Sequence, residues 1–199
     1  MELSFQLDCA SSGQGSNYQL QKTLLLAIVG MNLSLMTVLS VFRTLARYNR
    51  IANERLYLAC AQIADEDYRR QRAGSFGSIH ALLNHNLLAD RIWMSRFSGG
   101  GKSTPPLHTV LCDQFQALRI AREQEDASME EFFQNAPAGF LTSKLSYTNS
   151  KSQHYEEAAV PAVLHMFNHQ THHRGQVHIM LSQCGNQPPS LDMHRILNP

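Results

Sequence analysis

The chain has 199 residues, of which 43% are hydrophobic and 17% charged, so it can bury a core and is too apolar to be disordered along most of its length. Its formal net charge is +1 and no block of Lys or Arg stands out, which leaves no electrostatic case for binding nucleic acid. The four cysteines have no CxxC or other metal-ligand spacing, which is typical of reduced thiols in a cytoplasmic protein.

The N-terminal stretch joins a polar start, rich in Ser, Gly and Gln, to an uncharged run from Thr23 to Phe42. The run approaches the length of a membrane span, but a glycine and several polar residues dilute it, and we expect it to continue into the first helix of the domain. Lys22 is the only basic residue before it, so we expect no signal peptide. We predict that residues 1–35 form an N-terminal extension, either disordered or the product of a start codon placed too early, since Met31 or Met36 would be a natural beginning.

Three helices are expected in the first two thirds of the chain. Apolar residues recur at three- and four-residue steps from about Met36 to Ala64, which predicts a long amphipathic helix. Ser78 is a plausible N-cap for a second helix from about Ile79 to Phe97, which ends at a triple glycine. A third helix is predicted from about Thr109 to Phe133, after a Pro-Pro pair.

The pattern changes over residues 139–160, where short β-rich runs flank a turn-forming segment, and this predicts a small hairpin or an extended lid. Pro161 suits the first turn of a last helix, which runs to about Cys184 before Gly185. Four long helices with a long connection before the last predict an all-α fold, a four-helix bundle over residues 36–199.

Histidines carry the chemical signal, because seven of the ten lie in the last quarter of the chain. His169 and His173 are four residues apart on the last helix, so both imidazoles project from one face and can point at one metal ion. By spacing alone, His165 and His169 would serve equally well. A third ligand must come from another helix, where His85 lies in the middle of an apolar pattern and His80 near the helix start is a competitor.

Two segments carry a resemblance to a known family: IHALLNHNLLADRIWMSRF, with its mid-helix His followed by Asp and Trp, and LHMFNHQTHHRGQVH, with its HxxxHRGQ. Together they resemble the DinB family, the DinB/YfiT-like metalloenzymes and damage-inducible DinB proteins, over about residues 36–195. The resemblance implies a four-helix bundle that holds a divalent metal, nickel or zinc, through His85, His169 and His173. It also implies a homodimer, and relatives in the wider superfamily are transferases and isomerases that use low-molecular-weight thiols.

The chemistry expected of such a site follows from its ligand count. Three neutral imidazoles leave the ion's charge at +2 and leave open positions, where a water or thiol loses its proton more easily. No fourth ligand and no di-iron EXXH motif is apparent. Residues expected around the ligands or in the pocket are Asp90, Trp93, His172 and Gln176.

Two functions remain open at this point. The first is a metal-dependent enzyme that activates a thiol or water for transfer or hydrolysis on a small electrophilic molecule. The alternative is a non-enzymatic metal-binding stress-response protein. For both we expect a cytoplasmic protein that binds neither nucleic acid nor a membrane.

Overall fold

The computed structural model describes residues 12–100, 105–149 and 151–199. The chain divides into two compact units, Met1–Val38 and Leu39–Pro199. Its elements in order are α1 (Ser12–Cys60), α2 (Asp65–Arg69), α3 (Ile79–Phe97), α4 (Phe115–Asn135), the 3-10 helix η1 (Ala138–Thr142), β1 (Lys144–Thr148), β2 (His154–Ala158), α5 (Ala159–Gln183) and α6 (Met193–Leu197).

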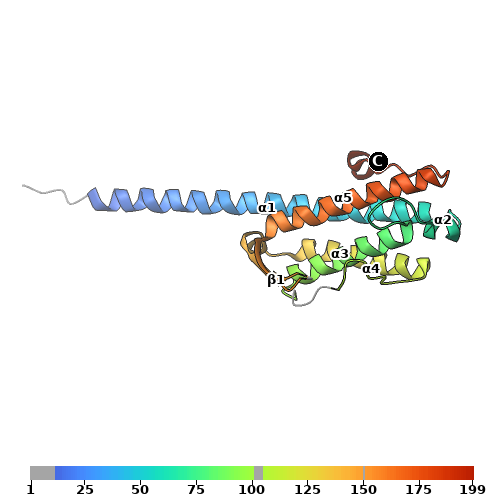
Figure 1. Cartoon of the computed structure of the whole chain (residues 1–199). Helices are drawn as coiled ribbons and strands as arrows, with labels where there is room; N and C mark the ends of the chain where they lie inside the picture. The colour runs from blue at the N-terminus through green and yellow to red at the C-terminus, as the bar shows by residue number, and fades with distance from the viewer. Residues whose placement is uncertain (1–11, 101–104, 150) are drawn as a thin grey trace, which may run out of the picture. The chain divides into compact units, whose positions relative to one another are not determined.

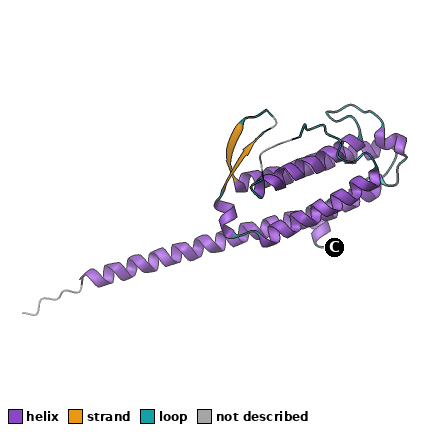
Figure 2. Cartoon of the chain, turned by 90° about the horizontal axis from the view of Figure 1, so that it is seen from below, coloured by secondary structure: helices purple, strands orange, loops and turns teal. Residues whose placement is uncertain are grey.

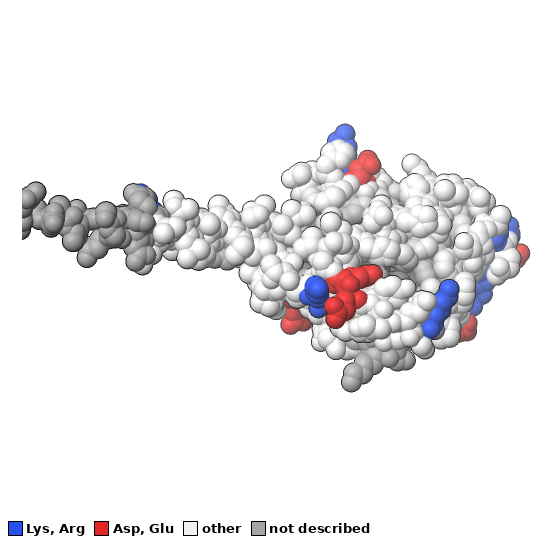
Figure 3. Space-filling view, turned by 60° about the vertical axis from the view of Figure 1, so that its left-hand side comes forward, with Lys and Arg blue, Asp and Glu red and all other residues white. Residues whose placement is uncertain are grey.

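The first unit contains the uncharged run as far as Val38, and the whole run lies within α1, as expected. Most of its large apolar side chains from Leu20 to Met36 are exposed, and no residue between Thr23 and Phe42 is charged (Figure 3). The stretch Leu20–Cys60 contains an 18-residue window with a mean hydropathy of 2.2, so it is long and apolar enough to cross a membrane. Core helices and signal sequences share these properties, so the assignment of residues 1–35 as an extension stays a prediction.

The second unit is a bundle of four long helices, α3, α4, α5 and the part of α1 from Leu39 onward (Figure 1). A two-stranded antiparallel sheet of β1 and β2 lies at one end of the bundle, just before α5 (Figure 2). The predicted all-α four-helix bundle with a small hairpin before the last long helix is therefore confirmed.

Each long helix contributes apolar side chains to the core between them. Leu56, Leu83, Leu118 and Leu181, one from each helix, are almost completely buried in one cluster. Aromatic rings fill the end of the bundle near the hairpin, where the ring centres of Phe42 and Phe133 lie 5.8 Å apart. Burial of this surface is the main force that holds the helices together.

A set of buried polar side chains interrupts this apolar core, and it begins with an ion-pair triad between α3 and α4. Arg122 of α4 donates to Asp90 of α3 at 2.6 Å and contacts Asp126, one turn further along α4, at 2.9 Å. All three side chains are at most 3% exposed. Buried charges require such pairing, because the loss of hydration costs several kcal/mol per ion, on the order of the whole stability of a domain.

Asparagines of α1 extend the triad to the other two helices. Asn49 and Asn53 both donate to Asp126, at 3.1 and 3.0 Å. Their side-chain oxygens in turn accept from Arg174 of α5. The four long helices of the bundle are thus connected through buried hydrogen bonds as well as through apolar contact.

Helix ends follow the expected signals where a local cap decides them. Ser78 caps α3 by accepting a hydrogen bond from the Ala81 amide at 3.1 Å, and α3 spans Ile79–Phe97 as predicted. Pro161 lies in the first turn of α5, and Gly185 follows its end with a φ of 75°.

The predicted start of the third helix at Thr109 is wrong, because α4 begins at Phe115. The buried side-chain oxygen of Asn84 on α3 accepts the amides of Leu111 and Cys112, at 2.8 and 2.9 Å. These amides are therefore held against α3 in a loop. Just after them, Asp113 pairs with Arg69 at 3.1 Å.

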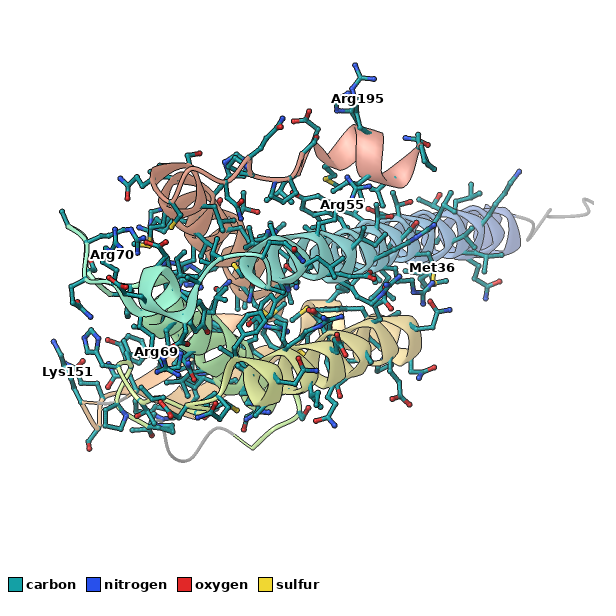
Figure 4. The ribbon with its side chains drawn as sticks, turned by 90° about the vertical axis from the view of Figure 1, so that its right-hand side faces the viewer. Met36, Arg55, Arg69, Arg70, Lys151 and Arg195 are labelled. Carbon is teal, nitrogen blue, oxygen red and sulfur yellow. The ribbon has the colours of Figure 1, made fainter. Side chains whose placement is uncertain are left out.

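The short helix α2, which provides Arg69, was not predicted from the sequence (Figure 4). At the other end of the chain, Arg55 of α1 donates to the carbonyl of Ser190 at 3.1 Å and holds the segment that leads into α6 (Figure 4).

The buried triad makes a direct prediction about stability. Replacing Arg122 with Gln leaves Asp90 and Asp126 buried without their cation, so we expect the free energy of unfolding to fall by about 3–5 kcal/mol. Urea denaturation followed by circular dichroism measures the change. Arg119→Gln, on the same helix but paired with Glu123 at the surface, is the matched control and should cost no more than about 1 kcal/mol. Equal losses in the two variants would contradict a special role for the buried triad.

Candidate metal centre

Three histidines from two helices converge in the second unit. His85 lies in the middle of α3 and is buried, while His169 and His173 project from one face of α5, one turn apart. One ring nitrogen from each lies within 4.8 Å of the other two. Within the described residues no other His, Cys, Asp or Glu joins this group.

The spacing of the nitrogens suits a small ion. The Nε2 atom of His169 lies 3.3 Å from Nε2 of His85 and 3.0 Å from Nε2 of His173. Nitrogens bound to one tetrahedral zinc at about 2.0–2.1 Å would lie roughly 3.3–3.4 Å from each other. Two of the three nitrogen–nitrogen distances are therefore close to those around one bound ion, and the third is at most 4.8 Å.

Acceptors on the far side of two rings determine where the imidazole protons lie. Nδ1 of His85 is 3.0 Å from the carbonyl oxygen of Leu107, and Nδ1 of His173 is 2.9 Å from Oε1 of Gln176. Both oxygens can only accept, so each Nδ1 carries the proton and donates it. In the neutral rings, the Nε2 atoms of His85 and His173 are then unprotonated, and their lone pairs face His169.

Three converging nitrogens with this protonation cannot satisfy one another. Nε2 of His169 can donate at most one proton, and it faces two lone pairs. A half-satisfied group of buried polar atoms is costly, whereas a cation would accept all three lone pairs. The donor set and its outer acceptors therefore fit a divalent transition metal.

Burial and mutual repulsion keep these rings neutral. Burial, and then the neighbouring imidazoles, lower the pKa of His169 from the usual 6.5 to about 3. Burial likewise lowers the pKa of His173 to about 4, and that of His85 below its usual value. The rings are therefore unprotonated at neutral pH, as metal ligands must be.

A hydrogen bond next to the cluster sets the position of α3 relative to α5. Asn86 donates to Oε1 of Gln170 at 2.8 Å, and both side chains are buried. Asn86 follows His85 directly and Gln170 follows His169 directly. This contact was not predicted, since neither residue has a sequence signal beyond lying beside a histidine.

Phe76 is a second feature of the site that the sequence did not predict. Its ring stacks on His85 with centres 3.9 Å apart and lies edge-on to His173 at 5.5 Å. It belongs to the loop between α2 and α3, where an aromatic residue between glycines is the one hint in the sequence. An apolar ring against two of the candidate ligands excludes water from that side.

The competing histidines lie elsewhere. His165 is exposed, and its ring centre is 6.1 Å from that of His169 and 5.2 Å from that of Trp93. His80 is buried and hydrogen-bonded to the hydroxyl of Tyr68 at 3.2 Å. Neither joins the cluster of three.

The residues expected around the ligands separate into two groups. Gln176 contacts His173, and its amide nitrogen lies 3.1 Å from Nε2 of the exposed His172, so these two do lie beside the cluster. Asp90 instead belongs to the buried triad with Arg122. Trp93 lies beside His165, with ring centres 5.2 Å apart, so its place is next to the cluster and not within it.

Comparison with known proteins gives one consistent family. A model of the DinB family matches residues 31–199. The curated relative Protein DinB of Bacillus subtilis (strain 168) is 28% identical over 150 residues, which cover 71% of this chain and 84% of the relative. The crystal structure of a DinB-like protein from Bacillus cereus ATCC 10987, at 2.01 Å resolution, matches with a TM-score of 0.54 and 16% identity over 70% of this chain and 89% of that one, which shows a shared fold.

The lowered pKa values predict how the metal-free protein responds to acid. Below pH 6.5 the unfolded chain takes up protons on His169 and His173, while the folded protein keeps these two rings unprotonated until about pH 3–4, so acidification favours unfolding. We expect His169→Asn to reduce the stability lost between pH 7 and pH 5 by about 1 kcal/mol, with allowance for the ring's partial exposure. Urea denaturation of chelator-treated protein at the two pH values measures this.

His154→Asn, in the exposed hairpin, is the control and should leave the pH dependence of stability unchanged. If His169→Asn lost as much stability on acidification as the wild type does, the ring would not be held neutral by the fold.

Proposed function

The chain belongs to the DinB family, and on this premise we propose that His85, His169 and His173 hold one divalent transition metal ion, nickel or zinc. The observation that supports this is the convergence of three Nε2 atoms. Two of them are unprotonated, because Leu107 and Gln176 accept hydrogen bonds from the Nδ1 atoms of the same rings. Nitrogen ligands suit both metals, and availability in the cell decides between them.

We further propose that the site is catalytic. Three protein ligands leave open coordination positions on the ion, and a metal held in this way lowers the pKa of a thiol or water that binds there. The reaction proposed is transfer of a low-molecular-weight thiol, or hydrolysis, on a small electrophilic molecule. The protein is proposed to act as a cytoplasmic homodimer.

The chain's own residues provide orientation and protection from water. The Leu107 carbonyl and the Gln176 amide hold the imidazoles of His85 and His173 in one rotation and one tautomer. Phe76 covers the face of His85. His172, exposed and bonded to Gln176, connects this arrangement to solvent.

Elemental analysis of purified protein tests metal binding. Wild-type protein expressed in metal-replete medium should retain metal in stoichiometric amount, and His85→Ala, His169→Ala and His173→Ala should each lose it. His165→Ala should keep the metal, since its ring lies outside the cluster, and exposed His194→Ala is the matched surface control. Gln176→Ala should weaken metal affinity by roughly 10- to 100-fold, as loss of an orienting partner does.

Wild-type protein that holds no metal would overturn the proposal. Loss of metal from His165→Ala with retention in His173→Ala would assign the other histidine pair as ligands.

Turnover tests the catalytic part separately. Metal-loaded protein should convert electrophilic substrates in a panel of low-molecular-weight thiols or of hydrolysable esters and amides, and His173→Ala should abolish this activity together with metal content. Chelation followed by re-addition of the metal should restore the rate. A protein that holds stoichiometric metal but turns over nothing in either panel would favour the alternative of a non-enzymatic metal-binding protein.

A further inference from the structure

A recess lies beside the histidine cluster, between the end of α3, the hairpin and the start of α5. Its volume is about 620 Å³, which is enough for a small organic molecule. The side chains that give it chemical character are Trp93 and Arg96 of α3, Tyr147, Tyr155 and Glu157 of the hairpin, and His165 of α5. None of these residues is a proposed metal ligand.

Arg96 is the least satisfied charge in the recess. Its guanidinium carbon lies 4.5 Å from the ring centre of Trp93 and 3.8 Å from that of Tyr147, so aromatic rings occupy its faces. Within the described parts of the chain its side chain makes no ion pair and no hydrogen bond, and Glu157 of the hairpin is the nearby carboxylate that attracts it. Burial lowers the pKa of Arg96, yet a guanidinium stays charged at neutral pH. Its N–H edge is thus available to an anion.

Aromatic rings make one wall of the recess flat and apolar. Tyr147 and Tyr155 are directly opposite each other in the sheet, and their rings stack with centres 5.7 Å apart and planes inclined by 17°. Trp93 lies edge-on to Tyr147 at 5.9 Å. Such a wall favours a ligand with a planar or aromatic body.

The hairpin also limits the charge that the recess accepts. Glu157 is two residues from Tyr155, so it lies on the same face of the sheet, and the Tyr147 hydroxyl donates a hydrogen bond to it. One cation and one anion therefore line the recess. Glu157 repels any anion that pairs with Arg96, and it repels a phosphate with two negative charges more strongly than a single carboxylate, so the recess favours the carboxylate of the two.

His165 connects the recess to the proposed metal site. Its ring centre is 5.2 Å from Trp93 and 6.1 Å from His169. A molecule bound against the aromatic wall can therefore extend past His165 toward the cluster. This last step, but not binding in the recess itself, rests on the proposed function.

We propose that this recess is a substrate subsite for a small planar or aromatic molecule with one carboxylate, which forms a paired hydrogen bond with Arg96. The aromatic wall holds the body of the ligand, and its other end lies toward His169. The substrate class of the metal site is thereby narrowed to aromatic monocarboxylates and their close relatives.

Fluorescence can test the recess directly, because Trp93 is the only tryptophan in the chain. Metal-loaded wild type is titrated with 3-phenylpropionate and with 3-phenylpropionamide, which have nearly the same shape and differ in charge. We expect saturable quenching or enhancement, with the carboxylate bound at least about tenfold more tightly than the amide, as a charge-assisted hydrogen bond predicts. Calorimetry confirms both dissociation constants without reliance on the fluorophore.

Variants separate Arg96 from general effects. Arg96→Gln should abolish the preference for the carboxylate, while Arg91→Gln, on the exposed side of the same helix and paired with Glu125, should retain it. Glu157→Gln should have the opposite effect to Arg96→Gln and tighten carboxylate binding by a few fold, because it removes a repelling charge. Circular dichroism of each variant establishes that it is folded.

Equal affinity for the two probes in wild type, no saturable binding, or a preference that survives Arg96→Gln would overturn the proposal. Repeating the titration after removal of metal with a chelator separates this result from the proposed function. We expect the carboxylate to bind in the recess without metal as well. The subsite can therefore be shown in a protein that holds no metal, and it can fail in a protein that does hold metal.

Discussion

The hydrogen bond between Asn86 and Gln170 joins α3 to α5 at the residues that directly follow His85 and His169. A shift of either helix by one residue moves a side chain by about 1.5 Å along the axis and 100° around it, which would separate the clustered nitrogens. Such a shift would also leave buried amide groups unpaired, at a cost of about 1–3 kcal/mol each. One short contact therefore fixes the register on which the three-histidine geometry depends.

The buried triad around Arg122 extends the same constraint to the helices that provide no candidate ligand. Apolar surfaces slide past one another at little cost, whereas Asp126 must keep contact with α1 through Asn49 and Asn53, and those asparagines with α5 through Arg174. A purely apolar core would stabilise the bundle at least as well. The polar set instead selects one packing of the helices, and the candidate site needs one packing to bring its nitrogens within range of a single ion.

Local signals in the sequence were sufficient wherever a local interaction decides the structure. The cap at Ser78 gave both the start and the identity of α3, and the glycine after α5 gave its end. The start of α4 could not be predicted, because the side chain that holds the preceding loop, Asn84, lies about one helix earlier in the chain. The choice of His169 with His173 over His165 with His169 likewise depends on a residue that is distant in the sequence. Spacing of four residues is equal in both pairs, so the spacing alone could not choose between them. The family resemblance pointed to His169 with His173, and the position of His85 on the facing helix distinguishes the two pairs in the structure.

His165, His169 and His173 follow one another at one-turn intervals on α5, and the residues of α3 that face them determine their different neighbours. His85 faces His169 and His173, and Trp93, two turns further along α3, faces His165. Along α3 the residue next to the cluster, His85, comes before Trp93, whereas along α5 His165 comes before His169 and His173. The two helices are therefore antiparallel here, and together they form one wall that runs from the cluster to the recess. The hairpin before α5 adds the opposite wall through Tyr147. The hairpin closes this end of the bundle, where its Leu145 and Tyr147 side chains are buried, and the same strand provides the wall against which the proposed ligand would lie.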